Sequence, residues 1–204
     1  MEKHVLPHRY RPSRRQPRVS TLNRERIKQA DSVLRAGGII AYPTESCYGL
    51  GCDPRNNRAI RTLLDIKHRH WNKGLIIVAA SVDQLESYIK PIQFNLEKVL
   101  QSWPGPTTWI LPASEGVSHY LRGVHDGIAV RVTDHPLASL LCRTYRSPIV
   151  STSANPEGKP PALSAKGVRR YFDDKVDLVI EGPLGGLERP TPIYDGVSGK
   201  RLRA

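Results

Sequence analysis

The chain has 204 residues, 39% of them hydrophobic, and a formal net charge of +12. This length suits one large domain, and the hydrophobic fraction is sufficient for a core. The charge favours an anionic partner or substrate, such as a nucleotide or RNA. A membrane-spanning protein is excluded, because no window approaches the roughly 20 apolar residues of a span, and the N-terminus lacks the apolar region of a secretory signal.

The first 20 residues differ in composition from the rest of the chain. They are rich in proline and arginine and lack a helical pattern. We expect residues 1–20 to form a flexible arm, either a solubilising one or one that contacts nucleic acid. Residues 21–204 are expected to form a single domain.

Apolar helical and strand patterns alternate along this predicted domain. The first helix ends at Gly37-Gly38, and Pro43 ends the strand that follows. The pattern predicts one mixed α/β domain. The expected helices cover 21–36, a segment around 60–67, 82–89, 94–100, 137–145 and 164–171; the expected strands cover 39–42, 75–80, 107–111, 127–132, 149–150 and 176–180, with a terminal hairpin of 193–194 and 201–203.

Several polar residues fall where such a fold binds ligands. Thr44 follows the first strand, and α/β sheets bind ligands at strand ends. Lys67 continues the apolar stripe of the second helix, so we expect it to face a cleft. Arg131 breaks a strand pattern and therefore requires a partner. A run of hydroxyl and amide side chains, 151–155, follows the strand 149–150. Cations and small polar donors together suit a polyphosphate.

Each of these residues also has a plain structural interpretation. Thr44 could be a turn residue after Pro43, and Thr108 could be ordinary strand filling. Arg131 could serve a structural ion pair. Asn155 could belong to an Asn-Pro turn, and Lys67 could extend past the edge of the core.

The cysteines and histidines do not indicate a metal or disulfide site. Cys47, Cys52 and Cys142 are odd in number and form no Cys-x-x-Cys pair. His68 and His70 lack accompanying carboxylates or thiols, so we expect no bound zinc. A reducing cytoplasm is the simplest setting.

Seven short motifs, in order, carry a resemblance to a known family. The sequence resembles the YrdC/Sua5 threonylcarbamoyl-AMP synthases, most closely their short bacterial branch, from Arg24 to Arg203. The motifs are Ala41-Tyr42-Pro43-Thr44-Glu45, Tyr48-Gly49-Leu50-Gly51, Lys67-x-Arg69, Lys73-Gly74-Leu75, Trp103-Pro104-Gly105-Pro106-x-Thr108, Val130-Arg131-Val132-Thr133-Asp134-His135-Pro136 and Ser153-Ala154-Asn155 with Gly158.

The resemblance implies a YrdC-like twisted sheet with a positively charged concave cleft. It also implies synthesis of L-threonylcarbamoyladenylate and pyrophosphate from L-threonine, bicarbonate and ATP, with Mg²⁺ arriving on the ATP. The product would serve t6A modification at position 37 of tRNA, through partner proteins that complete the transfer. Direct tRNA binding and a cytoplasmic location are further expectations.

The family's site residues transfer to matching positions here. Lys67 and Arg69 are the expected catalytic residues, because a substrate carboxylate attacks the α-phosphate and the protein must neutralise charge. Thr44, Thr108, Arg131 and Thr191 are the expected threonine-binding residues. The expected nucleotide-binding residues are Lys67, Arg69, Ser151, Ser153, Asn155 and Arg203, with no protein metal ligand.

Some positions depart from the family pattern. Lys73 stands where longer members often have Asn, and Val78 stands where they have His. Pro156-Glu157 replaces the more usual Leu-Ser. The alternative function is a non-catalytic protein of the same fold that binds tRNA or rRNA, although the low aromatic content of 6% offers few stacking residues.

Overall fold

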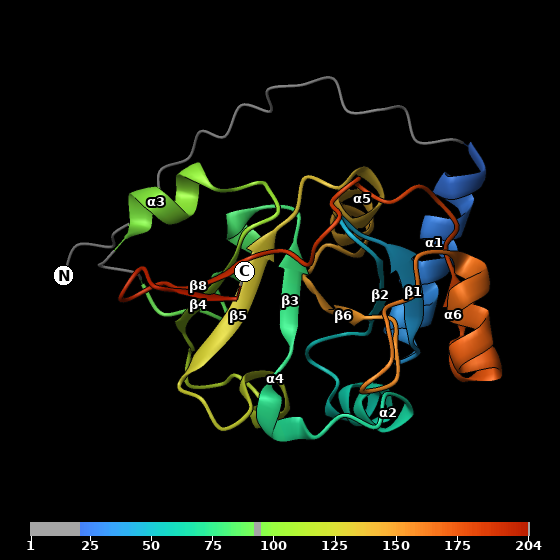
Figure 1. Ribbon diagram of the computed structural model, residues 1–204, viewed down its shortest axis with the longest axis horizontal. Coiled ribbons are helices and arrows are strands. Elements are labelled where there is room, and N and C mark those ends of the chain that lie inside the picture. Colours follow the sequence, from blue (N-terminus) through green and yellow to red (C-terminus); the bar gives the residue numbers. More distant parts are fainter. Residues whose placement is uncertain (1–20, 92–94, 204) are drawn as a thin grey trace.

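The structure is a computed structural model that describes residues 21–91 and 95–203. Its centre is a nine-stranded sheet with the order β7-β1-β2-β6-β3-β5-β4-β8-β9 (Figure 1). The sheet contains both parallel pairs (β1–β7, β3–β5 and β4–β8) and antiparallel ones, which confirms the mixed α/β class. The strands are β1 (Ile40–Pro43), β2 (Tyr48–Gly51), β3 (Ile76–Ala79), β4 (Thr108–Pro112), β5 (Gly127–Val132), β6 (Ile149–Ser153), β7 (Leu178–Val179), β8 (Ile193–Asp195) and β9 (Arg201–Arg203).

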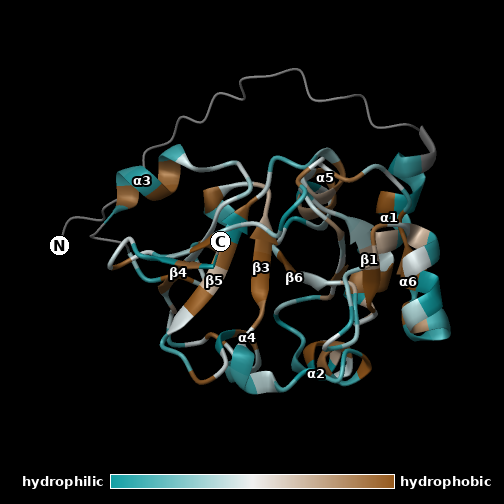
Figure 2. Ribbon diagram, in the orientation of Figure 1, coloured by the Kyte–Doolittle hydropathy of each residue, from teal (hydrophilic) through white to brown (hydrophobic). Residues whose placement is uncertain are grey.

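Helices cover both faces of this sheet. They are α1 (Thr21–Arg35), α2 (Asn57–Ile66), α3 (Leu96–Gln101), α4 (His119–Arg122), α5 (Pro136–Tyr145) and α6 (Ala165–Phe172), with 3₁₀ turns at Trp71–Lys73, Val82–Leu85 and Asp173–Lys175. In Figure 2 the central strand β3 is mostly hydrophobic, whereas α6 shows many hydrophilic residues. Among the described residues, no helix is long and apolar enough to cross a membrane.

Two hydrophobic cores lie on opposite faces of the sheet, because successive strand residues point to opposite sides. On β3, Ile77 belongs to the larger core, which also contains side chains from α2, α4 and α6. Its neighbour Val78 belongs to the smaller core, formed with α1 and α5. The pairs Ala41–Tyr42 on β1 and Val150–Ile149 on β6 divide in the same way. Each helix thus packs against one of the two faces that the alternation of strand side chains creates.

Strand β2 was not predicted, because two glycines interrupt its apolar pattern. It pairs with β1 on one side and β6 on the other. A Cβ atom at Gly51 would lie 2.6 Å from the Val150 carbonyl oxygen and 2.9 Å from the Tyr42 ring. Gly51, one of the two glycines that interrupt the apolar pattern, is therefore required by the close approach of the neighbouring strands.

Two further expectations were wrong in detail. The predicted helix 82–89 is a 3₁₀ turn over Val82–Leu85 followed by further turns, and Ile89 pairs with Ala113 in an isolated bridge. The expected polar loop after residue 150 is still strand as far as Ser153, because β6 is bonded between β2 and β3. Helix α4 was not predicted. The predicted arm 1–20 and the start of the predicted helix at Phe94 lie outside the described residues.

Candidate functional site

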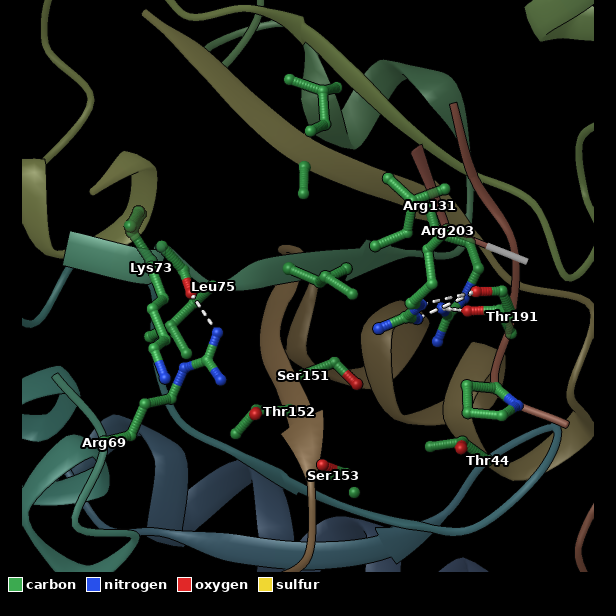
Figure 3. A pocket seen from close by; sticks show the side chains of 18 of the residues that line it. Thr44, Arg69, Lys73, Leu75, Arg131, Ser151, Thr152, Ser153, Thr191 and Arg203 are labelled. Carbon is green, nitrogen blue, oxygen red and sulfur yellow. Dashed lines mark hydrogen bonds between the residues drawn. The ribbon is translucent and has the colours of Figure 1, made fainter. Parts of the chain in front are cut away.

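A cavity of about 290 Å³ opens on one face of the sheet (Figure 3). Its wall comes from the strands β2 to β6, from the turn after β1, from the segment 69–75 before β3, from α4, and from the segment that leads into β8 with the end of β9. Five basic side chains contribute to it, together with hydroxyl groups. The basic residues are Arg69, Lys73, Arg122, Arg131 and Arg203, and the hydroxyl residues are Thr44, Ser46, Ser151, Thr152, Ser153 and Thr191.

Strand alternation explains why polar residues face this cavity. On β5, Val130 points into the larger core, so Arg131 points to the other face. On β6, Val150 likewise belongs to the larger core, whereas Ser151 and Ser153 line the cavity. This is the face that α1 and α5 cover elsewhere in the sheet. The cavity is therefore the part of that face where polar strand residues replace apolar ones.

Arg131 joins three segments of the chain at one end of the cavity. Its Nη1 atom donates to the Thr108 hydroxyl at 3.1 Å and to the Thr191 hydroxyl at 2.9 Å. Its Nη2 atom lies 3.2 Å from Glu45 Oε2, and both side chains of this ion pair are 5% exposed. The Thr133 hydroxyl donates to the other Glu45 oxygen at 2.6 Å. Arg131 is thereby held in one orientation by three groups, one of which, Glu45, is itself held by Thr133.

Glu45 balances the charge of Arg131. Burial disfavours the ionised carboxylate, but the Arg131 charge and the Thr133 hydroxyl outweigh burial and lower the pKa of Glu45. Sequence reasoning predicted that Arg131 needs a partner but did not place Glu45 in the site. The available signal was a carboxylate directly after a strand that ends at the ligand-binding edge.

The segment before β8 carries Thr191 to the cavity and is held by backbone bonds. Gly185 donates to the Thr44 carbonyl at 3.0 Å, and Leu187 donates to the Glu45 carbonyl at 2.9 Å. Arg203, on β9, donates to the Thr191 carbonyl through Nη2 at 2.9 Å. Figure 3 shows Arg203 beside Arg131 and Thr191, with Thr44 below them. The C-terminal hairpin therefore completes this end of the cavity.

Arg69 and Lys73 lie at the other end, across β6 (Figure 3). Arg69 Nη2 donates to the Gly74 carbonyl at 3.0 Å, and its buried Nε has no hydrogen-bond partner. Burial lowers the pKa of Arg69, but an arginine remains charged at neutral pH. Lys73 forms an ion pair with Glu157, in the loop that follows β6.

Lys67 is buried and Asn155 is half-buried, and neither lines the cavity. The Lys67 ammonium donates to the carbonyl oxygens of Ser153 and, at 2.6 Å, of Asn155. Burial, with the nearby Arg69 charge, lowers the pKa of Lys67 to about 8. The Asn155 amide donates to the Pro156 and Lys159 carbonyls at 3.1 and 2.7 Å, which closes a tight turn.

The structure brings most of the predicted site residues together. Seven of the ten line the cavity: Thr44, Arg69, Arg131, Ser151, Ser153, Thr191 and Arg203. Thr108 contacts it through Arg131, whereas Lys67 and Asn155 are not in its wall. The site prediction omitted Lys73, Arg122 and Glu45. Lys73 is the first residue of the motif Lys73-Gly74-Leu75, so the sequence offered a signal for it. Arg122 comes from α4, which no sequence pattern indicated. Val78 lies in the smaller core, away from the wall.

No group of three or more His, Cys, Asp or Glu side chains suitable for a metal ion occurs within 21–91 and 95–203. The three cysteines are free thiols. What the cavity does offer is fixed cations, hydroxyls and backbone groups, and these bind anionic, polar small molecules.

A mixed nine-stranded sheet with such a cavity defines a class of small-molecule-binding α/β proteins, and comparisons narrow this class. The family model Sua5/YciO/YrdC, described as "Telomere recombination", matches residues 32–203. A threonylcarbamoyl-AMP synthase from Halorhodospira halophila is 50% identical over 179 residues, which cover 87% of this chain and 94% of the relative. One from Coxiella burnetii is 49% identical over 87% of this chain and 96% of the relative. The chain belongs to the Sua5/YciO/YrdC family.

Solved structures agree with this assignment. P. abyssi Sua5 complexed with L-threonine has a TM-score of 0.78 and 35% identity over 83% of this chain. E. coli YciO has a TM-score of 0.74 and 27% identity, covering 89% of this chain and 88% of its own. The match covers 50% of the P. abyssi Sua5 chain, so this protein spans about half of that relative's length. The similarity confirms the YrdC-like fold.

Proposed function

We propose that the protein is a threonylcarbamoyl-AMP synthase. It joins L-threonine, bicarbonate and ATP into L-threonylcarbamoyladenylate, with release of pyrophosphate and water. The observation that carries this proposal is the distribution of charge in the cavity. Two basic ends, one with Arg69 and Lys73 and one with Arg131 and Arg203, lie on either side of the hydroxyl residues of β6. The reaction brings together two anionic substrates, and this arrangement is suited to hold both.

The end at Arg131 is the proposed threonine site. The donors of Arg131 are already oriented by Glu45, Thr108 and Thr191, so binding costs little reorganisation. Thr44 and Thr191 supply hydroxyls in the wall that suit the amino acid's own hydroxyl. The family relative from P. abyssi was solved with L-threonine bound, which supports an amino-acid site in this fold.

The nucleotide is proposed to lie along β6 toward Arg69. Ser151 and Ser153 present hydroxyls from the strand, and Arg69 can hold two phosphate oxygens at once. Arg203 stands on the boundary with the threonine end. The attacking carboxylate belongs to the N-carboxythreonine substrate, so the protein's task is to align it with the α-phosphate and neutralise charge. Mg²⁺ enters with the ATP, because the described residues offer no metal cluster.

The wider role follows from the product. We propose that residues 21–204 act as one catalytic domain in the cytoplasm and supply the intermediate for t6A at position 37 of tRNA. Separate proteins that complete t6A would transfer the product, and the basic side chains that line the cavity would favour encounter with nucleotide and tRNA.

The test is direct synthesis. The purified protein is incubated with ATP, L-threonine, bicarbonate and Mg²⁺, and mass spectrometry follows threonylcarbamoyladenylate while a coupled assay follows pyrophosphate. We expect both products in equal amounts, and neither when threonine or bicarbonate is omitted. A mixture that yields no adenylate but retains tight tRNA binding would replace the proposal with a non-catalytic RNA-binding role.

A further inference from the structure

Lys67 is at the end of α2, where it contacts the loop after β6 in both directions. Its ammonium donates to the carbonyls of Ser153 and Asn155, and its own carbonyl accepts from the Glu157 amide at 2.8 Å. Residues 153–157 are therefore joined to α2 by three hydrogen bonds, all made by one residue. Two of the three are lost if the side chain is removed.

The position of this ammonium does not suit a phosphate contact. Lys67 is 3% exposed and is not part of the cavity wall, whereas Arg69 and Lys73 are. A lysine ammonium has three N–H donors, and two of them already bond carbonyl oxygens. Because the ammonium lies outside the cavity wall, its remaining donor does not face a ligand there. To reach one, the side chain would have to move away and leave the two part-buried carbonyls without this partner, which is costly.

We infer that Lys67 is a positioning residue, which fixes the backbone of 153–157 so that the Ser153 hydroxyl faces the cavity, and that it does not contact the nucleotide. This inference rests on the proposed function for the identity of the ligand. It assigns charge neutralisation to Arg69 and Lys73, and it gives Lys67 a purely geometric role in the same site.

The first experiment compares ligands of different charge. Lys67→Met removes the donors at similar length, and Lys73→Met makes the same change in a residue that lines the cavity. Dissociation constants for AMP and ATP are measured by calorimetry. For Lys67→Met we expect both affinities to fall by the same factor, within about twofold. For Lys73→Met we expect the affinity for ATP to fall by about tenfold more than the affinity for AMP, which is the scale of one charge-assisted contact. A selective loss of ATP affinity in Lys67→Met would overturn the inference.

A second variant separates hydrogen bonding from charge. Lys67→Gln keeps N–H donors without positive charge. A positioning role predicts that it retains more affinity than Lys67→Met for AMP and ATP alike. A direct phosphate contact predicts that both variants lose ATP affinity equally. The same binding assay with Ser153→Ala, alone and combined with Lys67→Met, completes a double-mutant cycle. When Ser153 is already alanine, Lys67→Met should have little further effect on affinity. An undiminished effect would contradict action through Ser153.

The wild-type protein supplies a readout that requires no variant. With ¹⁵N-labelled lysine, the Lys67 ammonium should give a slowly exchanging NMR signal, because it is buried and bonded to carbonyls. We expect this signal to persist, with little shift, when ATP saturates the site. A fast-exchanging Lys67 signal, or one shifted strongly by ATP but not by AMP, would refute the inference. Absence of nucleotide binding by the wild type would instead refute the proposed function, so the two failures are distinguishable.

Discussion

At the scale of single residues, the site depends on groups that are held before any substrate arrives. Arg131 contacts Glu45, Thr108 and Thr191, which come from three separate segments. Fixed donors stabilise a developing charge better than mobile ones, because no reorganisation is needed during the reaction. Arg69 has fewer partners, since its one hydrogen bond goes to the Gly74 carbonyl. The buried Nε atoms of Arg69 and Arg131 both lack a partner. The two basic ends therefore differ in the number of groups that orient the arginine, and each keeps an unbonded donor.

The first prediction concerns phosphate binding at Arg69. Replacement by alanine removes a fixed cation from the cavity wall, so kcat/KM for ATP should fall by an amount equal to about 2–4 kcal/mol of transition-state stabilisation. Arg61→Ala is the matched control, because Arg61 is exposed on the preceding helix α2. Steady-state pyrophosphate release measures both. Kinetics of Arg69→Ala within twofold of wild type would remove Arg69 from the site.

The second prediction concerns the buried ion pair. Glu45→Gln leaves Arg131 without its counter-charge, so the free energy of unfolding at pH 7 should fall by about 3 kcal/mol. Because the folded pKa of Glu45 is lowered, the carboxylate contributes stability above its unfolded pKa of about 4.3. That contribution disappears as the pH falls through the folded pKa. The difference between wild type and variant should therefore shrink on acidification below about pH 4.

Urea denaturation at pH 7 and at low pH measures this difference. Glu86→Gln serves as control, because Glu86 is exposed and the substitution should leave the unfolding free energy nearly unchanged. A gap that stays constant across the pH range would show that Glu45 is not ionised in the folded protein.

At the scale of elements, the close spacing of neighbouring strands limits the size of the side chains that fit between them. β2 lies between β1 and β6, and its glycines allow that spacing. The strand β6 then runs directly into the loop that Lys67 and Glu157 attach to α2 and to the 3₁₀ turn at Trp71–Lys73. Changes in packing of this layer should therefore reach the cavity wall.

The third prediction tests the spacing. Gly51→Ala places a Cβ 2.6 Å from the Val150 carbonyl, so the unfolding free energy should fall by about 1–3 kcal/mol. Gly116→Ala is the control, because nothing lies within 4 Å of a Cβ there. Denaturant unfolding of both variants gives the comparison. Equal stability of Gly51→Ala and wild type would mean that the strands can separate without cost.

The fourth prediction concerns the Glu157–Lys73 ion pair. Glu157 places a carboxylate beside a cation that lines the cavity, so it competes with an incoming phosphate for Lys73. Glu157→Gln should lower KM for ATP by about threefold and leave kcat similar. Glu181→Gln breaks the comparably exposed pair with Arg169 and should change neither constant. A raised KM in Glu157→Gln would indicate that the ion pair assists binding instead.

At the scale of the whole molecule, the described fold contains every residue of the candidate site. The family match begins at residue 32 and ends at 203. The fifth prediction follows: a variant that starts at Ser20 should synthesise the adenylate at the wild-type rate. If residues 1–19 contact RNA, the shortened protein should bind tRNA more weakly and with a smaller dependence on salt. Loss of synthesis in a folded shortened protein would contradict the proposed division at residue 20.

The sequence by itself determined the class of fold and most of the site. Apolar periodicity was sufficient for α1, α2, α5 and β5, because each has one strongly apolar face that packing must bury. A continuous apolar run was sufficient for β3, which is buried on both faces. The order of short motifs identified the family. The same resemblance predicted Thr44, Arg69, Arg131 and Thr191 as site residues, and all four line the cavity.

The tertiary structure alone decided what depends on contacts between distant segments. β2 has no local strand signal, since glycine is required at residue 51 by the Val150 carbonyl and the Tyr42 ring, which belong to other strands. The Glu45–Arg131 pair joins residues that are separated in the chain by the strands β2, β3 and β4 and the helices α2, α3 and α4. Lys67 points inward as its stripe predicts, yet it meets carbonyl oxygens and not the cavity. A residue's spacing fixes the direction of its side chain, whereas its partners are fixed by how the rest of the chain packs.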